Sequence, residues 1–292
     1  MLFRSIWIKK FVIMKKDLIK SYAKINLSLN VLGKNKNGFH RIQSIISFLD
    51  FHDKIFIGPI NNKRHLISFS GNFSKNLKNN TVSKLLNILD KKNLLKKKYR
   101  IQIKKNIPQK AGLGGGSMNA ASILSYFLKN KIISISQKDA IKICNQIGSD
   151  VFLGLDRKNL ILKNNKTIKK YDVKLGLFAI LFKPKIGCST KKIYKNVRNF
   201  SRNKIKISSK AFKIENLKNA HNDLEEPAFK IYPILKKIKV FLSNIDQVKF
   251  VRMTGSGSTI VAYFSNKKSA INGLNLVNKN FKNYWSILSK TI

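Results

Sequence analysis

Acidic residues are scarce in this sequence: 13 Asp and Glu stand against 59 Lys and Arg in 292 residues, for a formal net charge of +46. Cysteine is also scarce, and Cys144 and Cys188 alone cannot hold together a disulfide-rich secreted scaffold. They favour a reducing, cytoplasmic setting. The four histidines are far apart and no CxxC pair occurs, so the sequence predicts no metal site.

The basic charge is distributed along the whole chain as KK and KN pairs, and no single segment concentrates it. Such a pattern is typical of a solvated surface, although a basic nucleic-acid-binding protein remains an alternative. The sequence shows no aromatic RNA-binding strand motif and no recognition-helix motif. Hydrophobic residues make up 43% of the chain, which is enough for packed cores.

Residues 1–15 are apolar but are interrupted by Arg4, Lys9 and Lys10. These charges exclude a bilayer-spanning helix and the apolar region of a signal peptide. Met14 offers a second plausible start. We therefore predict a dispensable N-terminal extension over 1–15, with an amphipathic helix on a membrane surface as the alternative.

Residues 22–31, YAKINLSLNV, alternate apolar and polar side chains with period 2, which predicts a strand. Lys24 and Asn26 then lie on the same polar face. Periodicity alone favours a half-solvated sheet face, on which a lysine and an asparagine are ordinary.

Other segments show weaker patterns of the same kind. The polar stretch 160–174 predicts a junction between domains. Asp150, followed by an apolar run that reads as a strand, is typical of a cap or turn residue. The remaining predicted strands cover 41–49, 100–107, 175–182 and 259–264, and the predicted helices cover 79–89, 137–147 and a region opened by Asn222 and Asp223.

The segment 108–118, PQKAGLGGGSM, contains four glycines within five residues and precedes a helical pattern. Glycines let a backbone approach an anion closely, and the N–H groups of a helix N-terminus point toward it. Ser117 is the predicted N-cap of that helix. We therefore predict a phosphate-binding loop. No Lys follows the last glycine and GxGxxG is not completed, so it is neither a P-loop nor a dinucleotide fingerprint.

Three blocks together carry a resemblance to a known family: SYAKINLSLNVLGKNKNGFHRIQSI, PQKAGLGGGSMNAAS and RMTGSGSTIVAYF. With them the chain resembles the GHMP superfamily of small-molecule kinases. The resemblance implies an α+β fold of two domains, with a ribosomal-protein-S5-like ATP-binding domain over 16–168 and a ferredoxin-like domain over 169–292. It places the active site in the cleft between them.

The first block and NDLEEPAFKIYP resemble one branch of that superfamily in particular. Its members transfer the γ-phosphoryl group of ATP to the 2-hydroxyl of 4-diphosphocytidyl-2-C-methyl-D-erythritol in the non-mevalonate isoprenoid pathway. The resemblance therefore implies ATP as co-substrate, Mg²⁺ delivered with ATP, and a cytidine diphosphate derivative as the other substrate. No nucleic acid or membrane partner is expected, and we expect a monomer or a weak homodimer.

Site residues follow from the same resemblance by motif position. Lys24 is implied as the catalytic lysine and Asp150 as the base that takes the hydroxyl proton. The residues implied to bind ATP are Pro108, Gln109, Lys110, Ala111, Gly112, Leu113, Gly114, Gly115, Gly116, Ser117, Met118, Asn80 and Lys105. Those implied to bind the second substrate are Asn26, Phe39, His40, Thr190 and Tyr194, where two rings can stack on cytosine.

Two departures from the family pattern affect these expectations. Met118 stands where a second Ser is frequent, so one hydroxyl near the phosphates is lost. The segment after Asp150 reads VFLG, where the family usually has VPFF and a glycine-rich turn. A homoserine- or mevalonate-type kinase of the same superfamily remains an alternative, although neither substrate contains a pyrimidine.

Overall fold

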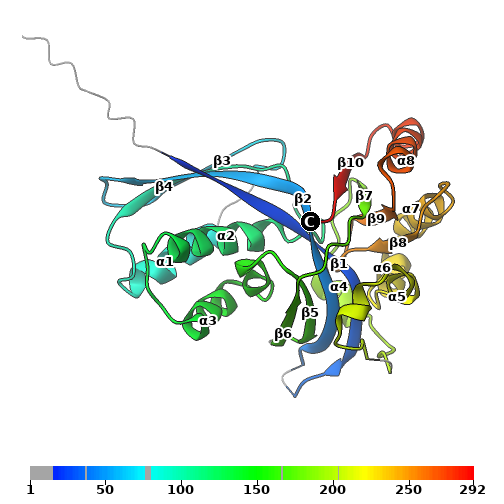
Figure 1. The fold of residues 1–292 in the computed structure, drawn as a ribbon, viewed down its shortest axis with the longest axis horizontal. Coiled ribbons are helices and arrows are strands. Elements are labelled where there is room, and N and C mark those ends of the chain that lie inside the picture. Colours follow the sequence, from blue (N-terminus) through cyan, green and yellow to red (C-terminus); the bar gives the residue numbers. More distant parts are fainter. Residues whose placement is uncertain (1–15, 37, 76–79, 166, 203) are drawn as a thin grey trace, which may run out of the picture.

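The computed structural model describes residues 16–36, 38–75, 80–165, 167–202 and 204–292. The predicted extension over 1–15 lies outside these residues. Two sheets, each covered by helices, lie side by side, and the long strands β1 and β2 of the first sheet extend to the second (Figure 1). Mixed helices and mainly antiparallel strands confirm the predicted α+β class.

The first sheet has the order β3-β4-β2-β5-β6, with β1 paired to β2. Only β3 and β4 are parallel; the other pairs are antiparallel. β2 is long enough to pair with β4 through its second half and with β5 through its first half. The strands are β1 (Asp17–Lys34), β2 (His40–Ile60), β3 (Leu66–Ser70), β4 (Lys98–Lys104), β5 (Asn159–Asn164) and β6 (Thr167–Tyr171).

Helices α1 (Thr81–Lys91), α2 (Gly115–Lys129) and α3 (Gln137–Ile147) cover one face of this sheet (Figure 1). Their apolar faces and the inward residues of β2 and β4 form one buried core. Burial of such area is the main favourable term in folding. Asn80 caps α1 by accepting from two backbone N–H groups, and Ser136 caps α3.

The second sheet has the order β10-β7-β9-β8 and is antiparallel throughout. Its core is shared with the helices packed on it, chiefly α6, α7 and α8. Its strands are β7 (Phe178–Lys183), β8 (Phe250–Met253), β9 (Ile260–Phe264) and β10 (Trp285–Lys290). Its helices are α4 (Thr190–Lys195), η2 (Ser209–Phe212), α5 (Ile214–Asn219), α6 (Glu225–Ile231), α7 (Pro233–Ser243) and α8 (Lys267–Asn280).

A third buried core joins the two sheets. It brings Ile25 and Leu27 of β1 against Leu181 of β7 and Tyr263 of β9. The backbone adds two single bridges, from Leu29 to Asn222 and from Leu49 to Thr291. The sheets are therefore fixed against each other along β1, the strand that carries Lys24.

The stretch 160–174 contains the hairpin of β5 and β6, with its described polar residues at the turn and on the exposed face, and its role as a junction between domains stays a prediction. The structure corrects two local expectations. Residues Val151–Leu155 form the 3₁₀ helix η1, not a strand. Gly114, not Ser117, is the N-cap of α2. The predicted boundary between residues 168 and 169 lies within β6 and stays a prediction.

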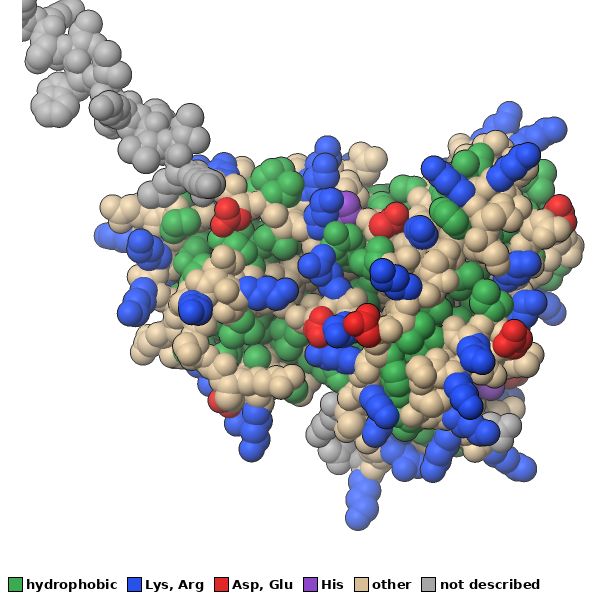
Figure 2. Space-filling model, viewed as in Figure 1, with side chains coloured by type: hydrophobic (Ala, Val, Ile, Leu, Met, Phe, Trp, Pro, Cys, Tyr) green, Lys and Arg blue, Asp and Glu red, His purple; other side chains and the backbone are tan. Residues whose placement is uncertain are grey.

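Basic residues are spread over the surface, just as they are spread along the sequence. Figure 2 shows Lys and Arg side chains spread over the whole visible face, without one basic patch that stands apart from the rest. Over the residues that the structure describes, no helix combines the length and the apolar character needed to cross a bilayer.

Candidate active site

The glycine loop, residues 108–118, turns into α2 through Gly114, whose φ of 68° is in the left-handed region that favours glycine. The amide of Met118 donates to the carbonyl of Gly114 at 2.8 Å, which starts the helical ladder. The N–H groups of the preceding turn, residues 115–117, are the ones that a helix N-terminus leaves without helical partners. The loop therefore presents the donors and the positive end of a helix dipole that bind an anion.

Two glycines of this loop are needed for close packing. A Cβ added at Gly112 would lie 2.1 Å from the carbonyl oxygen of Thr254. A Cβ added at Gly114 would lie 2.8 Å from Cγ of Lys24. The loop is thus held directly against both the residue 254–258 loop, here called the second glycine loop, and the side chain of Lys24.

A cavity of ≈ 390 Å³, here called the loop cavity, lies between the glycine loop and the start of α1. Asn80 and Thr81 border it, and the Thr81 hydroxyl donates to the carbonyl of Gly116 at 2.6 Å. Lys105 also lines it. The cavity therefore brings together all the residues that the sequence resemblance assigned to ATP except Met118. Its loop residues are Pro108, Gln109, Lys110, Ala111, Gly112, Leu113, Gly114, Gly115, Gly116 and Ser117.

Lys105 is buried and forms an ion pair with Asp53, which is fully buried on β2. Asp53 also accepts hydrogen bonds from the backbone N–H groups of Asn106 at 2.7 Å and Ile107 at 2.8 Å. All three interactions fix the segment that leads into the glycine loop. Sequence reasoning missed Asp53, because nothing near it in the chain marks it as a partner.

A second cavity of ≈ 390 Å³, here called the Lys24 cavity, lies on the other side of the glycine loop. Lys24 Nζ lies 3.3 Å from Oδ2 of Asp150 and donates to Oδ1 of Asn26 at 2.7 Å. Asp150 precedes η1, and its side chain is 39% exposed, whereas that of Lys24 is 5% exposed. The carboxylate is therefore open to a ligand while its cation is held in place.

The polar face of β1 is buried, which corrects the half-solvated expectation. Lys24, Asn26, Ser28 and Asn30 are all at most 4% exposed. The Asn26 amide donates to Ser44 on β2 at 2.8 Å. The glycine loop and the second glycine loop cover this face, so Lys24 and Asn26 line a site rather than a solvated sheet.

The second glycine loop ties the two sheets together at the site. Thr254 Oγ1 accepts from the backbone N–H of Asn26 at 3.0 Å and donates to the carbonyl of Gly112 at 3.1 Å. The Ser256 and Thr190 hydroxyls are hydrogen-bonded at 2.7 Å. The TGSGS run marks this segment as a loop, but the sequence pattern did not indicate that Thr254, Ser256 and Gly257 belong to the site.

An aromatic group lies at the N-terminal end of β2. The rings of His40 and Tyr194 are 5.0 Å apart, and Phe200 lies 6.3 Å from His40. Burial, with the charge of Lys34, lowers the pKa of His40, and its Nε2 is buried with no hydrogen-bond partner among the described groups. Burial, together with the charge of Asp150, raises the pKa of Tyr194. Tyr194 therefore connects this aromatic group to the Lys24 cavity.

Three predicted site residues line neither cavity: His40, which contacts Tyr194, and Phe39 and Met118. Phe39 is 72% exposed and stacks on no ring among the described residues, so the predicted sandwich with Tyr194 stays a prediction. Met118 points into the core, where a Cβ added at Gly154 would lie 2.7 Å from its sulfur. Gly154 of the altered segment after Asp150 thus makes room for Met118.

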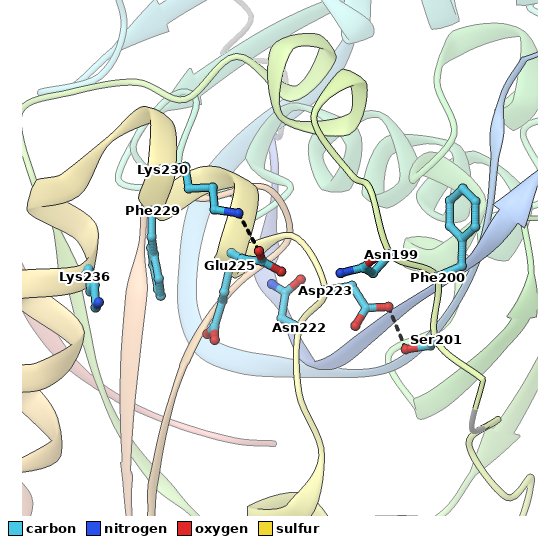
Figure 3. Close-up of a pocket in the computed structure, with 10 residues that line it drawn as sticks. Asn199, Phe200, Ser201, Asn222, Asp223, Glu225, Phe229, Lys230 and Lys236 are labelled. Carbon is cyan, nitrogen blue, oxygen red and sulfur yellow. Dashed lines mark hydrogen bonds and ion pairs between the residues drawn. The ribbon is translucent and has the colours of Figure 1, made fainter.

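The second sheet carries a further cavity of ≈ 630 Å³, shown in Figure 3. Of its lining residues, Ser201 donates to Oδ2 of Asp223 at 2.7 Å. His221, beside the lining, has its Nε2 3.1 Å from both the Ser201 hydroxyl and Oδ1 of Asp223. A nucleophile relay needs the two ring nitrogens of histidine for two different partners. Here one nitrogen faces both partners, so this group is not a hydrolase triad.

Comparison with known proteins identifies the family of this chain. The family GHMP kinases N terminal domain matches residues 80–156, and GHMP kinases C terminal matches residues 206–283. A 4-diphosphocytidyl-2-C-methyl-D-erythritol kinase of Pelagibacter ubique is 52% identical over 277 residues, which cover 94% of this chain and 98% of the relative. The enzyme of the same name from Clostridium kluyveri is 33% identical, with 87% and 92% covered.

The fold has a solved counterpart as well. The crystal structure of a 4-(cytidine 5'-diphospho)-2C-methyl-D-erythritol kinase matches with a TM-score of 0.76 at 22% identity, covering 94% of this chain and 99% of that one. This likeness confirms the predicted two-part kinase fold. With the near-full-length relatives, it shows that the chain belongs to the GHMP kinases and, within them, to the 4-diphosphocytidyl-2-C-methyl-D-erythritol kinase family.

Proposed function

We propose that this protein transfers the γ-phosphoryl group of ATP to the 2-hydroxyl of 4-diphosphocytidyl-2-C-methyl-D-erythritol, giving the 2-phosphate and ADP for non-mevalonate isoprenoid synthesis. One observation carries the proposal. The accessible carboxylate of Asp150, paired with Lys24, lies in a cavity that meets the loop cavity along the glycine loop. Lining residues shared by the two cavities are Lys110, Gly112, Gly114 and Ser117.

The loop cavity suits the nucleotide. The unpaired N–H groups at the start of α2 would bind the phosphates, because they are already oriented and need no rearrangement. Asn80 and Lys105 line the same cavity and would contact the adenine. The β- and γ-phosphates would then lie beside Lys24, whose stem packs on Gly114.

The reaction needs one proton acceptor. Asp150 takes the proton of the 2-hydroxyl as its oxygen bonds to the γ-phosphorus, and the bond from that phosphorus to the β–γ bridging oxygen breaks to release ADP. Lys24 stabilises the negative charge that develops on the transferred group. Asn26 holds the Lys24 ammonium between itself and Asp150.

Mg²⁺ is proposed to arrive bound to ATP. Among the described residues, no group of three or more His, Cys, Asp or Glu side chains could hold a metal ion. When bound, the ion would neutralise phosphate charge, a role that needs only a few protein ligands besides the phosphates. The hydroxyl of Ser117, at the meeting of the cavities, is the proposed protein contact.

The cytidine part of the substrate would lie against the aromatic group. A neutral His40 with a buried, unpartnered Nε2 can hydrogen-bond a pyrimidine edge. Tyr194 and the exposed ring of Phe39 can stack on the base, and Thr190, which also lines the Lys24 cavity, can hydrogen-bond the substrate.

The compartment and assembly belong to this proposal too. We place the enzyme in the cytoplasm, as a monomer or weak homodimer. Cys144 and Cys188 are free and buried, and burial raises the pKa of their thiols to about 12 and about 11. Such thiols are inert, which is compatible with a reducing compartment. Analytical ultracentrifugation at several concentrations would test the assembly.

Phosphorus NMR tests the proposed activity. The protein is incubated with Mg-ATP and the cytidine substrate, and a new phosphomonoester resonance should appear together with ADP. Homoserine and mevalonate serve as competing acceptors in parallel samples, and Asp150→Asn is the inactive control. Phosphorylation of homoserine or mevalonate instead of the cytidine substrate would overturn the assignment of substrate.

A further inference from the structure

Lys110 occupies a special place in the glycine loop, and the inference that follows rests on the proposed function. Three basic residues line the loop cavity and the Lys24 cavity: Lys24, Lys105 and Lys110. Of these, only Lys110 lines both cavities. In a phosphoryl transfer the moving group passes from the nucleotide to the acceptor, so it crosses the line along which these cavities meet.

The three lysines differ in what they pair with. Lys105 is held by the buried carboxylate of Asp53, and Lys24 is held by Asp150 and Asn26. Lys110 is exposed and has no ion pair within the described ranges. Its ammonium is therefore the one positive charge in these two linings that no protein carboxylate engages.

The backbone of Lys110 is also unusual. Its φ of 50° is in the left-handed region, which L side chains rarely adopt and glycine adopts without strain. Its stem lies over Gly187, where an added Cβ would approach Lys110 Cδ to 3.3 Å and Cβ to 3.4 Å. The chain thus keeps a lysine at a position that suits glycine and leaves room for its stem at Gly187.

We propose that Lys110 is a phosphate-binding residue that contacts the transferred phosphoryl group at the meeting of the two cavities. Negative charge spreads over the three equatorial oxygens of that group during transfer. Lys24 donates hydrogen bonds to the transferred group from the side of Asp150, and Lys110 does so from the side of Gly187. No proton is transferred by Lys110: the hydroxyl proton still goes to Asp150.

Three substitutions of Lys110 separate the contributions of its charge, its aliphatic stem and its backbone conformation. Lys110→Met keeps the stem and removes the charge, Lys110→Gly removes both and suits the φ of 50°, and Lys110→Arg keeps the charge. Lys237→Met, an exposed position on α7 outside both cavities, removes the same charge from the surface. We expect Lys110→Met and Lys110→Gly to lower kcat about 100-fold, with KM for the cytidine substrate within about twofold.

Lys110→Arg should keep kcat within about tenfold of wild type, and Lys110→Gly should melt within about 2 °C of it. Activity near wild type in Lys110→Gly would overturn the inference. A much higher activity in Lys110→Met than in Lys110→Gly would also overturn it, because the stem rather than the charge of Lys110 would then matter. An equal loss of kcat in Lys237→Met would also overturn the inference, because the effect would then come from net charge alone.

Calorimetry gives a readout that does not depend on turnover. Lys110→Met should weaken binding of an ATP analogue with a non-hydrolysable β–γ link about tenfold and leave ADP binding unchanged, because only the former carries a γ-phosphate. Equal affinities in variant and wild type would refute the role of Lys110 even if the proposed reaction is confirmed. Absence of phosphorylation by the wild type would instead refute the proposed function, whatever the calorimetry shows.

Discussion

Two lysine–aspartate pairs flank the glycine loop, and they are built differently. In the Lys105–Asp53 pair the side chains are 4% and 0% exposed, and in the Lys24–Asp150 pair they are 5% and 39% exposed. The lysines are alike, so the difference lies in the carboxylates. Burial of both partners makes a pair structural, whereas one accessible carboxylate makes the pair available for chemistry.

The hydrogen bonds of the two carboxylates agree with this distinction. Asp53 receives the Lys105 ammonium and the backbone N–H groups of Asn106 and Ile107. Asp150 receives the Lys24 ammonium and a long hydrogen bond of 3.4 Å from Ser149. Asp150 therefore keeps lone pairs that a substrate hydroxyl can approach, and Asp53 does not.

The largest effect is expected for Asp150→Asn. The amide keeps the shape of the side chain but cannot take the hydroxyl proton, so kcat should fall about 10²–10⁴-fold. Because Asp150 is partly exposed and the Lys24 ammonium keeps its hydrogen bond to Asn26, the free energy of unfolding should fall by about 1–3 kcal/mol, less than for the fully buried Asp53. Single-turnover kinetics and thermal melts on the same preparation check both parts, and a kcat close to wild type would remove Asp150 from the role of base.

Asp53→Asn should show the opposite pattern. It leaves the Lys105 ammonium buried without a counter-charge, which costs about 3–5 kcal/mol of stability. Denaturant unfolding measures this loss. The double variant Asp53→Asn/Lys105→Met removes the charge as well and should recover most of the stability. If the single variant is as stable as wild type, burial does not distinguish the two pairs.

Smaller effects are expected at the proposed cytidine end of the site. Phe39→Ala and Tyr194→Ala should each raise KM for the cytidine substrate about tenfold, or about 1.4 kcal/mol, with little change in KM for ATP. Phe39 is 72% exposed, so its truncation should not alter the melting temperature. Steady-state kinetics beside thermal melts test this; an unchanged KM for the cytidine substrate in both variants would refute the stacking role.

The smallest effect concerns a pair of intermediate burial, His221 with Asp223, whose side chains are 54% and 14% exposed. The hydrogen bond to Asp223 raises the pKa of His221. The pair therefore adds stability fully below pH about 6.5, the ordinary value for histidine, and loses it as pH rises through the higher folded pKa. The contribution should be below about 1 kcal/mol, because the histidine is largely exposed.

Denaturant unfolding of wild type and His221→Gln at pH 5 and pH 8 measures this linkage. The stability advantage of wild type over the variant should be larger at pH 5 than at pH 8. A difference that grows with pH would contradict the sign, and a difference independent of pH would mean that the pair does not titrate in this range.

Local patterns in the sequence correctly predicted several elements that carry candidate site residues. The alternation of 22–31 predicted the strand that carries Lys24, and the glycine run predicted a loop at a helix N-terminus. Both patterns arise from contacts within a few residues, which the sequence displays directly. The prediction of a strand over 151–155 was wrong, because a short apolar run does not distinguish a 3₁₀ helix from a strand.

By itself, the sequence determined the family, the glycine loop and the placement of Lys24 and Asp150 in matching motifs. Only the tertiary structure decided that the polar face of β1 is buried, that Asp53 neutralises Lys105 and that Thr254 joins the two glycine loops. Asn26 and Thr254 are 228 residues apart in the chain. Periodicity reports which side chains share a face of a strand, but what covers that face depends on segments that only folding brings together.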